Sequence, residues 1–273
     1  MEYKKWLPHP LLKPYVRYYT YMEIGIKDVW TSSAVVPTGC SVMCIIVGDQ
    51  LTLFKTQTGK EQPQSVFNVT GQFTVYTPFS FYGEHKVISI IFNPCGAFRL
   101  LSIDQYDCKD VNLNLFDLLP VRDRTIQQQF LDCQKPEETF SLLEDFLLQL
   151  LVKTKEKNSF SKIAYICNLL NQRPDEPLLI KKLCEEEGFS KSTLERNFME
   201  YVGIGPKHYH RIVRFNNLLN HIKQQKDFRH WTEIAYRFGY YDQAHFIKDF
   251  KVFYGKTPSE FSTNDELISN MVL

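Results

Sequence analysis

Near its C-terminus the chain reads Thr232-Glu-Ile-Ala-Tyr-Arg-Phe-Gly-Tyr-Tyr-Asp-Gln-Ala-His-Phe-Ile-Lys-Asp-Phe-Lys-Val-Phe-Tyr-Gly-Lys-Thr-Pro. An earlier stretch has the same layout and reads Leu179-Ile-Lys-Lys-Leu-Cys-Glu-Glu-Glu-Gly-Phe-Ser-Lys-Ser-Thr-Leu-Glu-Arg-Asn-Phe-Met-Glu-Tyr-Val-Gly-Ile-Gly-Pro. In each, a short helical pattern is followed by a Gly-aromatic corner, a second helical pattern and Gly-x-x-Pro. Two such units in register predict a pair of helix-turn-helix motifs. The alternative is a plain helical bundle with two Gly-aromatic corners.

The corner of each unit has residues that suit the end of one helix and the start of the next. Gly188 and Gly239 lie where the first helix must end, and glycine adopts the left-handed conformation there at low cost. Ser190 and Asp242 then precede the second helix, where their side chains can cap its free N–H groups. Each corner is therefore predicted to reverse the chain between two packed helices.

The second helix of each unit has an apolar face and a free face. Leu194 and Phe198 lie four residues apart, as do Phe246 and Phe250, so each pair is predicted to pack inward. A helix-turn-helix motif inserts the opposite face of this helix into the DNA major groove. That face carries Lys191, Ser192, Glu195 and Arg196 in the first unit and Gln243, Ala244, Ile247 and Lys248 in the second.

A helix over residues 207–225 is predicted to join the two units. Its inward stripe consists of Ile212, Phe215, Leu219 and Ile222. Arg211 and Arg214 are candidates to reach outward from this helix toward DNA. A solvated helix face is the alternative interpretation for both arginines.

The N-terminal part has a different pattern. Up to about Arg99, short β-rich runs alternate with Gly, Pro and Asn, which predicts a small β-barrel or sandwich. Helical spacing follows at residues 124–133 and 137–152, and the latter segment has a wide apolar stripe from Phe140 to Leu151. We expect that stripe to pair with a second copy of the chain, and packing on its own barrel is the alternative.

Several classes of function are not favoured by the sequence. No apolar run reaches the roughly 18 residues of a membrane helix, and the start lacks a signal-peptide pattern, so we expect a cytoplasmic protein. The seven cysteines are scattered without a Cys-x-x-Cys pair, which argues against disulfides and zinc. The β-rich part has only His9 and His85, and the chain has neither a phosphate-binding loop nor a nucleophile elbow. We therefore expect no catalytic residue, no metal site and no cofactor.

Residues from about 163 to 261 resemble the DNA-binding domain of the AraC/XylS family of transcription regulators. The segment from Ile234 to Phe261 follows the signature of the second unit of that family, including Gly255 and Pro258. Tyr240 replaces the usual Phe, and Val252 stands where a basic residue is common. The first unit matches more loosely, with Cys184 at a position that is usually Ala. The resemblance places Ser192, Glu195, Arg196, Gln243, Ala244 and Lys248 against base edges, and Lys191 and Arg211 complete the expected DNA contacts.

The stretches Leu7–Tyr19 and Ile90–Leu101 resemble the opening and close of degenerate cupin-like sensory domains in such regulators. The expected fold class is thus α+β with two domains. Residues 1–152 form a β-rich sensory or dimerisation domain with helices at 117–152. A linker (153–160), an all-α DNA-binding domain (161–262) and a C-terminal tail (263–273) follow.

The resemblance implies a bacterial activator whose partners are double-stranded DNA, RNA polymerase, a small-molecule effector and a second copy of the chain. An alternative is an N-terminal protein-interaction module without a ligand. A more distant one is a cupin-type enzyme fused to a DNA-binding domain. The sequence leaves the effector, the operator and the choice between activator and repressor open.

Overall fold

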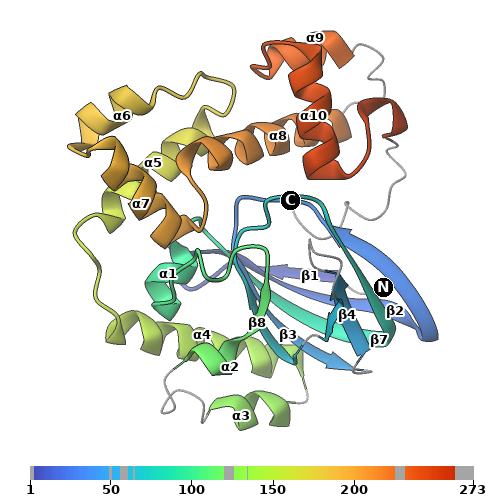
Figure 1. Cartoon of the computed structure of the whole chain (residues 1–273). Helices are drawn as coiled ribbons and strands as arrows, with labels where there is room; N and C mark the ends of the chain where they lie inside the picture. The colour runs from blue at the N-terminus through green and yellow to red at the C-terminus, as the bar shows by residue number, and fades with distance from the viewer. Residues whose placement is uncertain are drawn as a thin grey trace.

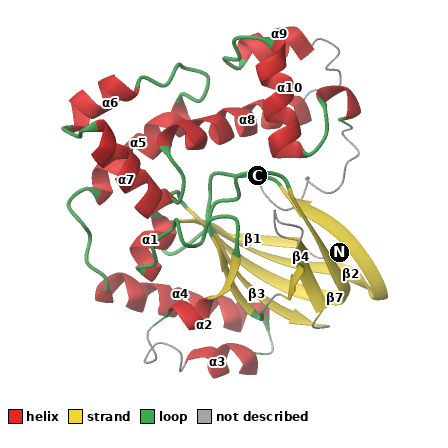
Figure 2. Cartoon of the chain, in the orientation of Figure 1, coloured by secondary structure: helices red, strands yellow, loops and turns green. Residues whose placement is uncertain are grey.

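The computed structural model describes residues 3–48, 51–55, 61–63, 65–119, 126–133, 135–224 and 231–261. Over these residues the N-terminal part is a curved antiparallel sheet with helices against it, and the C-terminal part is helical (Figure 1, Figure 2). This is the two-domain α+β class that the sequence predicts. The expected tail at 263–273 lies outside the described residues.

Two long strands organise the sheet. β2 (Val16–Val35) and β7 (Thr77–Phe92) pair along their whole lengths, with irregularities between Val16 and Tyr18 and between Ile26 and Trp30. The sheet order is β1-β2-β7-β3-β6-β8, and β4 pairs with both β5 and β7. The shorter strands are β1 (Tyr3–Trp6), β3 (Val42–Gly48), β4 (Leu51–Lys55), β5 (Glu61–Pro63), β6 (Phe67–Thr70) and β8 (Asn112–Asn114).

Helix α4 (Pro136–Lys153) covers the sheet and shares its core. Its apolar stripe is buried within the chain, with Leu143 and Leu147 fully shielded from solvent and Phe140 in ring contact with Trp6. The expectation that this stripe pairs with a second copy is therefore wrong. Packing on its own sheet already removes that apolar surface from water. Three smaller helices belong to the same part: α1 (Gly96–Leu101), α2 (Leu115–Leu118) and α3 (Ile126–Asp132).

The C-terminal part starts with α5 (Phe160–Gln172) and continues with two helix pairs joined by a long helix. The first pair is α6 (Ile180–Glu187) and α7 (Lys191–Val202), and the second is α9 (Trp231–Arg237) and α10 (Gln243–Tyr254). The long helix α8 (Pro206–Gln224) separates the pairs, and a 3₁₀ turn, η2 (Pro258–Glu260), follows α10. Figure 1 shows one pair at each end of α8.

The two parts are packed against each other through side chains and main chain. Val36 and Cys95 of the N-terminal part belong to the apolar core of the C-terminal helices. Phe98 contacts the ring of Tyr201, with centroids 4.4 Å apart. The helical part is therefore held against the sheet as well as joined to it in sequence.

Candidate nucleic-acid interface

In the first unit, the corner between α6 and α7 has left-handed and capping geometry. Gly188 has φ of +69° at the end of α6, a value that side chains on L-residues tolerate poorly. The Ser190 hydroxyl accepts a hydrogen bond from the Thr193 N–H at 3.1 Å and so caps α7. Leu194 and Phe198 are fully buried, and they turn one face of α7 into the core.

The second unit repeats this geometry. Gly239 has φ of +72° after α9, and the Asp242 carboxylate accepts from the His245 N–H at 2.7 Å at the start of α10. Phe246 and Phe250 are fully buried on the inner face of α10. The helix ends at Gly255, which has φ of +80°. Buried Pro258 then opens η2, whose capping box is formed by Thr257 and Glu260.

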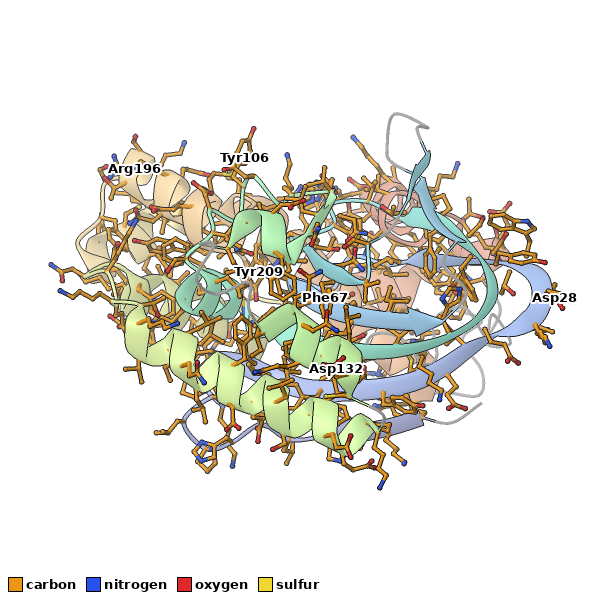
Figure 3. The ribbon with its side chains drawn as sticks, turned by 90° about the horizontal axis from the view of Figure 1, so that it is seen from below. Asp28, Phe67, Tyr106, Asp132, Arg196 and Tyr209 are labelled. Atoms are coloured by element: carbon orange, nitrogen blue, oxygen red, sulfur yellow. The ribbon has the colours of Figure 1, made fainter. Side chains whose placement is uncertain are left out.

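The opposite faces of α7 and α10 are open to solvent. Lys191, Ser192 and Arg196 are exposed on α7, and Gln243, Ala244 and Lys248 are exposed on α10. Figure 3 shows Arg196 at the outer edge of the molecule, far from the centrally placed Tyr209. Glu195 is half-buried, and a Cβ added at Gly205 would lie 2.8 Å from its carboxylate. Its side chain thus lies along the turn into α8.

Arg211 and Arg214 do not reach outward. Arg211 Nη2 donates to Asp249 Oδ1 at 2.6 Å, and Arg214 Nη2 lies 3.4 Å from Asp249 Oδ2. Asp249 is fully buried and Arg214 is 8% exposed, so this ion cluster lies inside the contact between α8 and α10. The expectation of an outward reach is wrong for both arginines, because a buried carboxylate requires compensating charge.

Asp249 is a residue that the sequence reasoning missed. A signal was present: Asp249 lies three residues after Phe246 and one before Phe250, so helical spacing places it on the inner face. A carboxylate on an apolar face needs a cationic partner. Arg211 and Arg214 on the joining helix were the cations available for that role.

The length of α8 sets the separation of the two units. Its 19 residues span about 28 Å at 1.5 Å per residue. Successive major-groove segments on one face of B-DNA lie roughly 34 Å apart. The arrangement therefore suits two helices that enter neighbouring groove segments.

The sheet domain contacts both recognition helices near their C-terminal ends. The Gln105 N–H donates to the Glu200 carbonyl of α7 at 3.0 Å, and the Tyr76 N–H donates to the Val252 carbonyl of α10 at 2.8 Å. His208 of α8 lies at the same boundary, against the Phe253 ring, where burial and then the charge of Arg211 lower its pKa. The N-terminal halves of α7 and α10 stay uncovered, and these are the halves that read bases in helix-turn-helix proteins.

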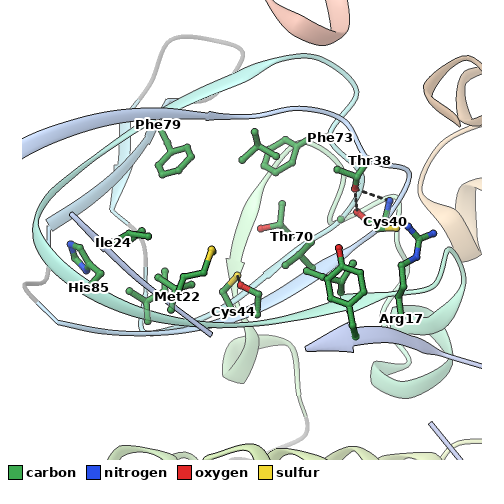
Figure 4. Close-up of a pocket in the computed structure, with 18 of the residues that line it drawn as sticks. Arg17, Met22, Ile24, Thr38, Cys40, Cys44, Thr70, Phe73, Phe79 and His85 are labelled. Carbon is green, nitrogen blue, oxygen red and sulfur yellow. Dashed lines mark hydrogen bonds between the residues drawn. The ribbon is translucent and has the colours of Figure 1, made fainter. Parts of the chain in front are cut away.

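The sheet domain contains a cavity of about 110 Å³. Figure 4 shows side chains from several strands around it, with His85 at one end and Arg17 at the other. Its walls are mainly apolar and include Met22, Ile24, Val42, Phe73, Phe79 and Phe81. The described part of the chain has no cluster of His, Cys, Asp or Glu suited to a metal ion. The helices described there are also too short or too polar to cross a membrane.

Comparison with known proteins bears on both parts. A family model described as "Helix-turn-helix domain" matches residues 183–264, the region of the two units. This region of the chain is thus a helix-turn-helix domain, and it resembles the DNA-binding domain of AraC/XylS regulators. A second model, "Domain of unknown function (DUF6597)", matches residues 4–114, which include the described strands of the sheet. The chain thus joins the paired helix-turn-helix units to a sheet domain that matches a different family model.

Curated relatives are similar to this chain over about a third of its length. An uncharacterized HTH-type transcriptional regulator of Staphylococcus aureus is 28% identical over 102 residues, which are 37% of this chain and 13% of that protein. Another, from Haemophilus influenzae, is 30% identical over 90 residues, or 33% of this chain and 30% of that protein. The chain thus spans 13% of the length of the Staphylococcus aureus relative and 30% of that of the Haemophilus influenzae relative.

Solved structures of ToxT from Vibrio cholerae align with most of the chain. One at 1.65 Å resolution has a TM-score of 0.48 and 13% identity, and it covers 88% of this chain and 97% of ToxT. A second, described as bound to an unsaturated fatty acid, has a TM-score of 0.48, 13% identity and coverages of 89% and 94%.

Proposed function

We propose that this chain is a transcription regulator that binds double-stranded DNA in a sequence-specific manner through the N-terminal halves of α7 and α10. The observation that carries the proposal is the pair of capped helices with exposed polar faces at the two ends of α8. Residues 161–262 act in this proposal as the DNA-binding domain and residues 1–152 as the regulatory domain, with 153–160 as the linker.

The exposed side chains suggest roles in base recognition. Arg196 and Lys248 suit guanine, whose O6 and N7 accept hydrogen bonds, and Gln243 suits adenine. Ser192 and Ala244 allow close approach of each helix to the groove, and Glu195 can accept from cytosine. Lys191, at the first turn of α7, is placed for a phosphate contact. Arg211 is not part of this set, because Asp249 holds its guanidinium.

The cavity in the sheet domain supports control by a small molecule. Thr38 and Cys40 line it, and Gly39 between them faces α8. A Cβ added at Gly39 would lie 3.3 Å from the Tyr209 ring and 3.7 Å from Val213. A ligand that moves this wall therefore acts on the helix that separates the two units. Activation through RNA polymerase and pairing with a second copy remain predictions.

The DNA interface is tested by selecting an operator from random duplexes and footprinting it. One subunit should protect about two helical turns, because two linked units occupy successive groove segments. Arg196→Ala is then measured on single-base operator variants at two salt concentrations. Loss of a base reader should cost about 1–3 kcal/mol and relax preference at one position. Lys27→Ala, an exposed cation on β2, serves as the control and should change nothing.

Different results would contradict different parts of the proposal. A uniform loss of affinity with a salt slope lower by about one unit would make Arg196 a phosphate contact. If one subunit protected only a single helical turn of DNA, one of the two helix-turn-helix units would not contact the operator. Failure to select any duplex would overturn sequence-specific binding itself.

A further inference from the structure

The polar groups in the cavity of the sheet domain are mostly satisfied within the protein. The Thr38 hydroxyl accepts from the Cys40 N–H, Thr70 donates to Asn112, and the Ser89 hydroxyl lies 3.4 Å from the Cys44 sulfur. Burial also raises the pKa of the Cys44 thiol to about 11, so this group is neutral near pH 7. These side chains do not require a ligand to complete their hydrogen bonds.

His85 differs from the other described side chains of the cavity wall. Its exposed fraction is 3%, and its Nδ1 atom is buried without a hydrogen-bond partner. Nε2 lies 2.8 Å from the Tyr82 carbonyl oxygen, which can only accept. In the neutral form of the ring, Nε2 therefore carries the proton and Nδ1 presents a lone pair. A buried acceptor left unpaired in this way is destabilising.

The described part of the cavity wall around His85 is aromatic and uncharged. The Phe81 ring meets the imidazole edge-on with centroids 5.6 Å apart, and Phe79 stacks next to Phe81 at 5.9 Å. Arg17 is the one described wall residue with a fixed charge, and it is exposed at the opposite end of the cavity (Figure 4). Among the described residues of the cavity wall, none close to His85 would compensate an anion there, and a charge in an apolar site is costly unless it is paired.

We propose that the effector of this regulator is a compact, neutral, mainly apolar molecule whose single hydroxyl donates to His85 Nδ1, as a phenol would. The cavity volume of about 110 Å³ is of the order that accommodates a single ring. Phe73, Phe79 and Phe81 of the cavity wall can make edge and face contacts with that ring. The inference rests on the effector control proposed above, and it is independent of the DNA interface.

The test compares phenol with toluene, which replaces the hydroxyl by a methyl group of similar size. Both are titrated into the full-length chain, with affinity measured by calorimetry and the His85 ring nitrogens followed by ¹⁵N NMR. Phenol should bind about tenfold more tightly than toluene. Phenol, and not toluene, should shift the Nδ1 resonance.

Two variants give the matched comparison. His85→Phe keeps an aromatic ring in the cavity wall but has no hydrogen-bond acceptor, so it should bind phenol and toluene alike. Ser89→Ala removes a cavity hydroxyl that already has a partner, so it should keep the preference for phenol. If His85→Phe does not fold, the NMR titration of the unmodified chain decides alone.

Three results would overturn the inference. These are equal affinity for the two probes (including no binding of either), a proton on Nδ1 of the free protein, and displacement of phenol by benzoate at far lower concentration. The last result would assign the site to an anion held by Arg17. Operator binding is measured on the same samples without any ligand, so a failure of the DNA-binding proposal would be seen separately.

Discussion

At the scale of single residues, Asp249 is the most deeply buried carboxylate among the described residues of the C-terminal domain. Its carboxylate is fully buried and lies within 4 Å of side-chain nitrogens of Arg211, Arg214 and His245. Arg214 also stacks on the Tyr240 ring at 4.1 Å, and burial raises the pKa of the Tyr240 hydroxyl above its usual range. The charge of Asp249 thus orients α10 relative to α8.

We predict that Asp249→Asn destabilises the C-terminal domain by about 3–5 kcal/mol, because it leaves Arg214 buried without a counter-charge. Urea unfolding followed by tryptophan fluorescence measures this, since Trp231 packs on Phe246 and Phe250. Glu185→Gln is the control, because it breaks an exposed pair with Lys181 at 3.8 Å and should cost less than about 1 kcal/mol. Similar costs for both variants would refute the role given to Asp249.

At the scale of the elements, α10 is held by an aromatic cluster. Phe250 contacts Phe215 of α8 at 5.4 Å, Trp231 of α9 at 5.7 Å and Phe261 at 5.8 Å. One side chain therefore joins both helices of the second unit to the joining helix.

Phe250→Ala should destabilise the second unit by about 3–5 kcal/mol, the usual cost of truncating a buried Phe. Binding to the operator should be lost in parallel, because α10 no longer keeps its orientation. Thermal unfolding and a gel-shift titration check the two effects. Tyr241→Ala is the stability control, since that ring is 88% exposed. Wild-type unfolding of Phe250→Ala would contradict the assigned packing.

Helix α4 allows a second prediction at this scale. Leu147 is fully buried against the sheet, so Leu147→Glu places a carboxylate in an apolar core and should cost about 3 kcal/mol or more. Val152→Glu, on the same helix at 87% exposure, should leave stability unchanged. Chemical unfolding and analytical ultracentrifugation are run on both. If Leu147→Glu kept its stability and changed only its oligomeric state, α4 would instead form an interface between two copies of the chain.

At the scale of the whole molecule, Gly203 shows how closely the sheet domain approaches the first unit. It ends α7 with φ of +91°, and a Cβ added there would lie 2.6 Å from the Gln105 carbonyl oxygen. Gly188 has a similar φ of +69°, but the nearest atom to a Cβ added there would be the end of a flexible lysine, Lys162 Nζ, at 3.9 Å. Both glycines therefore have a left-handed backbone conformation, but only Gly203 lies in close contact with the sheet domain.

Gly188→Ala and Gly203→Ala should both show the left-handed penalty of about 1–2 kcal/mol. Only Gly203→Ala should also separate the domains at this contact. The Gln105 N–H, which donates to the Glu200 carbonyl, should then exchange its hydrogen faster. Hydrogen exchange read by NMR makes the comparison. Equal protection of Gln105 in the two variants would mean that the domains are not held together there.

The sequence by itself determined the features of the helix-turn-helix units that depend on neighbouring residues. The corners at Gly188 and Gly239, the caps at Ser190 and Asp242 and the inward phenylalanines follow from helical spacing and local backbone preference. The predicted class, a β-rich domain followed by a helical one, is also confirmed. Apolar residues repeat every two residues in strands and every 3.6 residues in helices, and both repeats can be recognised within short segments of sequence.

Only the tertiary structure decided how distant segments meet. The partner of Arg211 lies 38 residues away and that of Arg214 lies 35 residues away. The spacing of the two arginines in the sequence was therefore equally consistent with exposure to solvent and with a buried ion pair. The stripe of α4 had two possible partners, and the curved sheet supplied the one observed. The cavity with unpaired His85 and the contacts of Gln105 and Tyr76 with the recognition helices likewise exist only once the strands have paired. Helical periodicity shows that a face must be buried, but the segment that buries it is selected by packing of the whole chain.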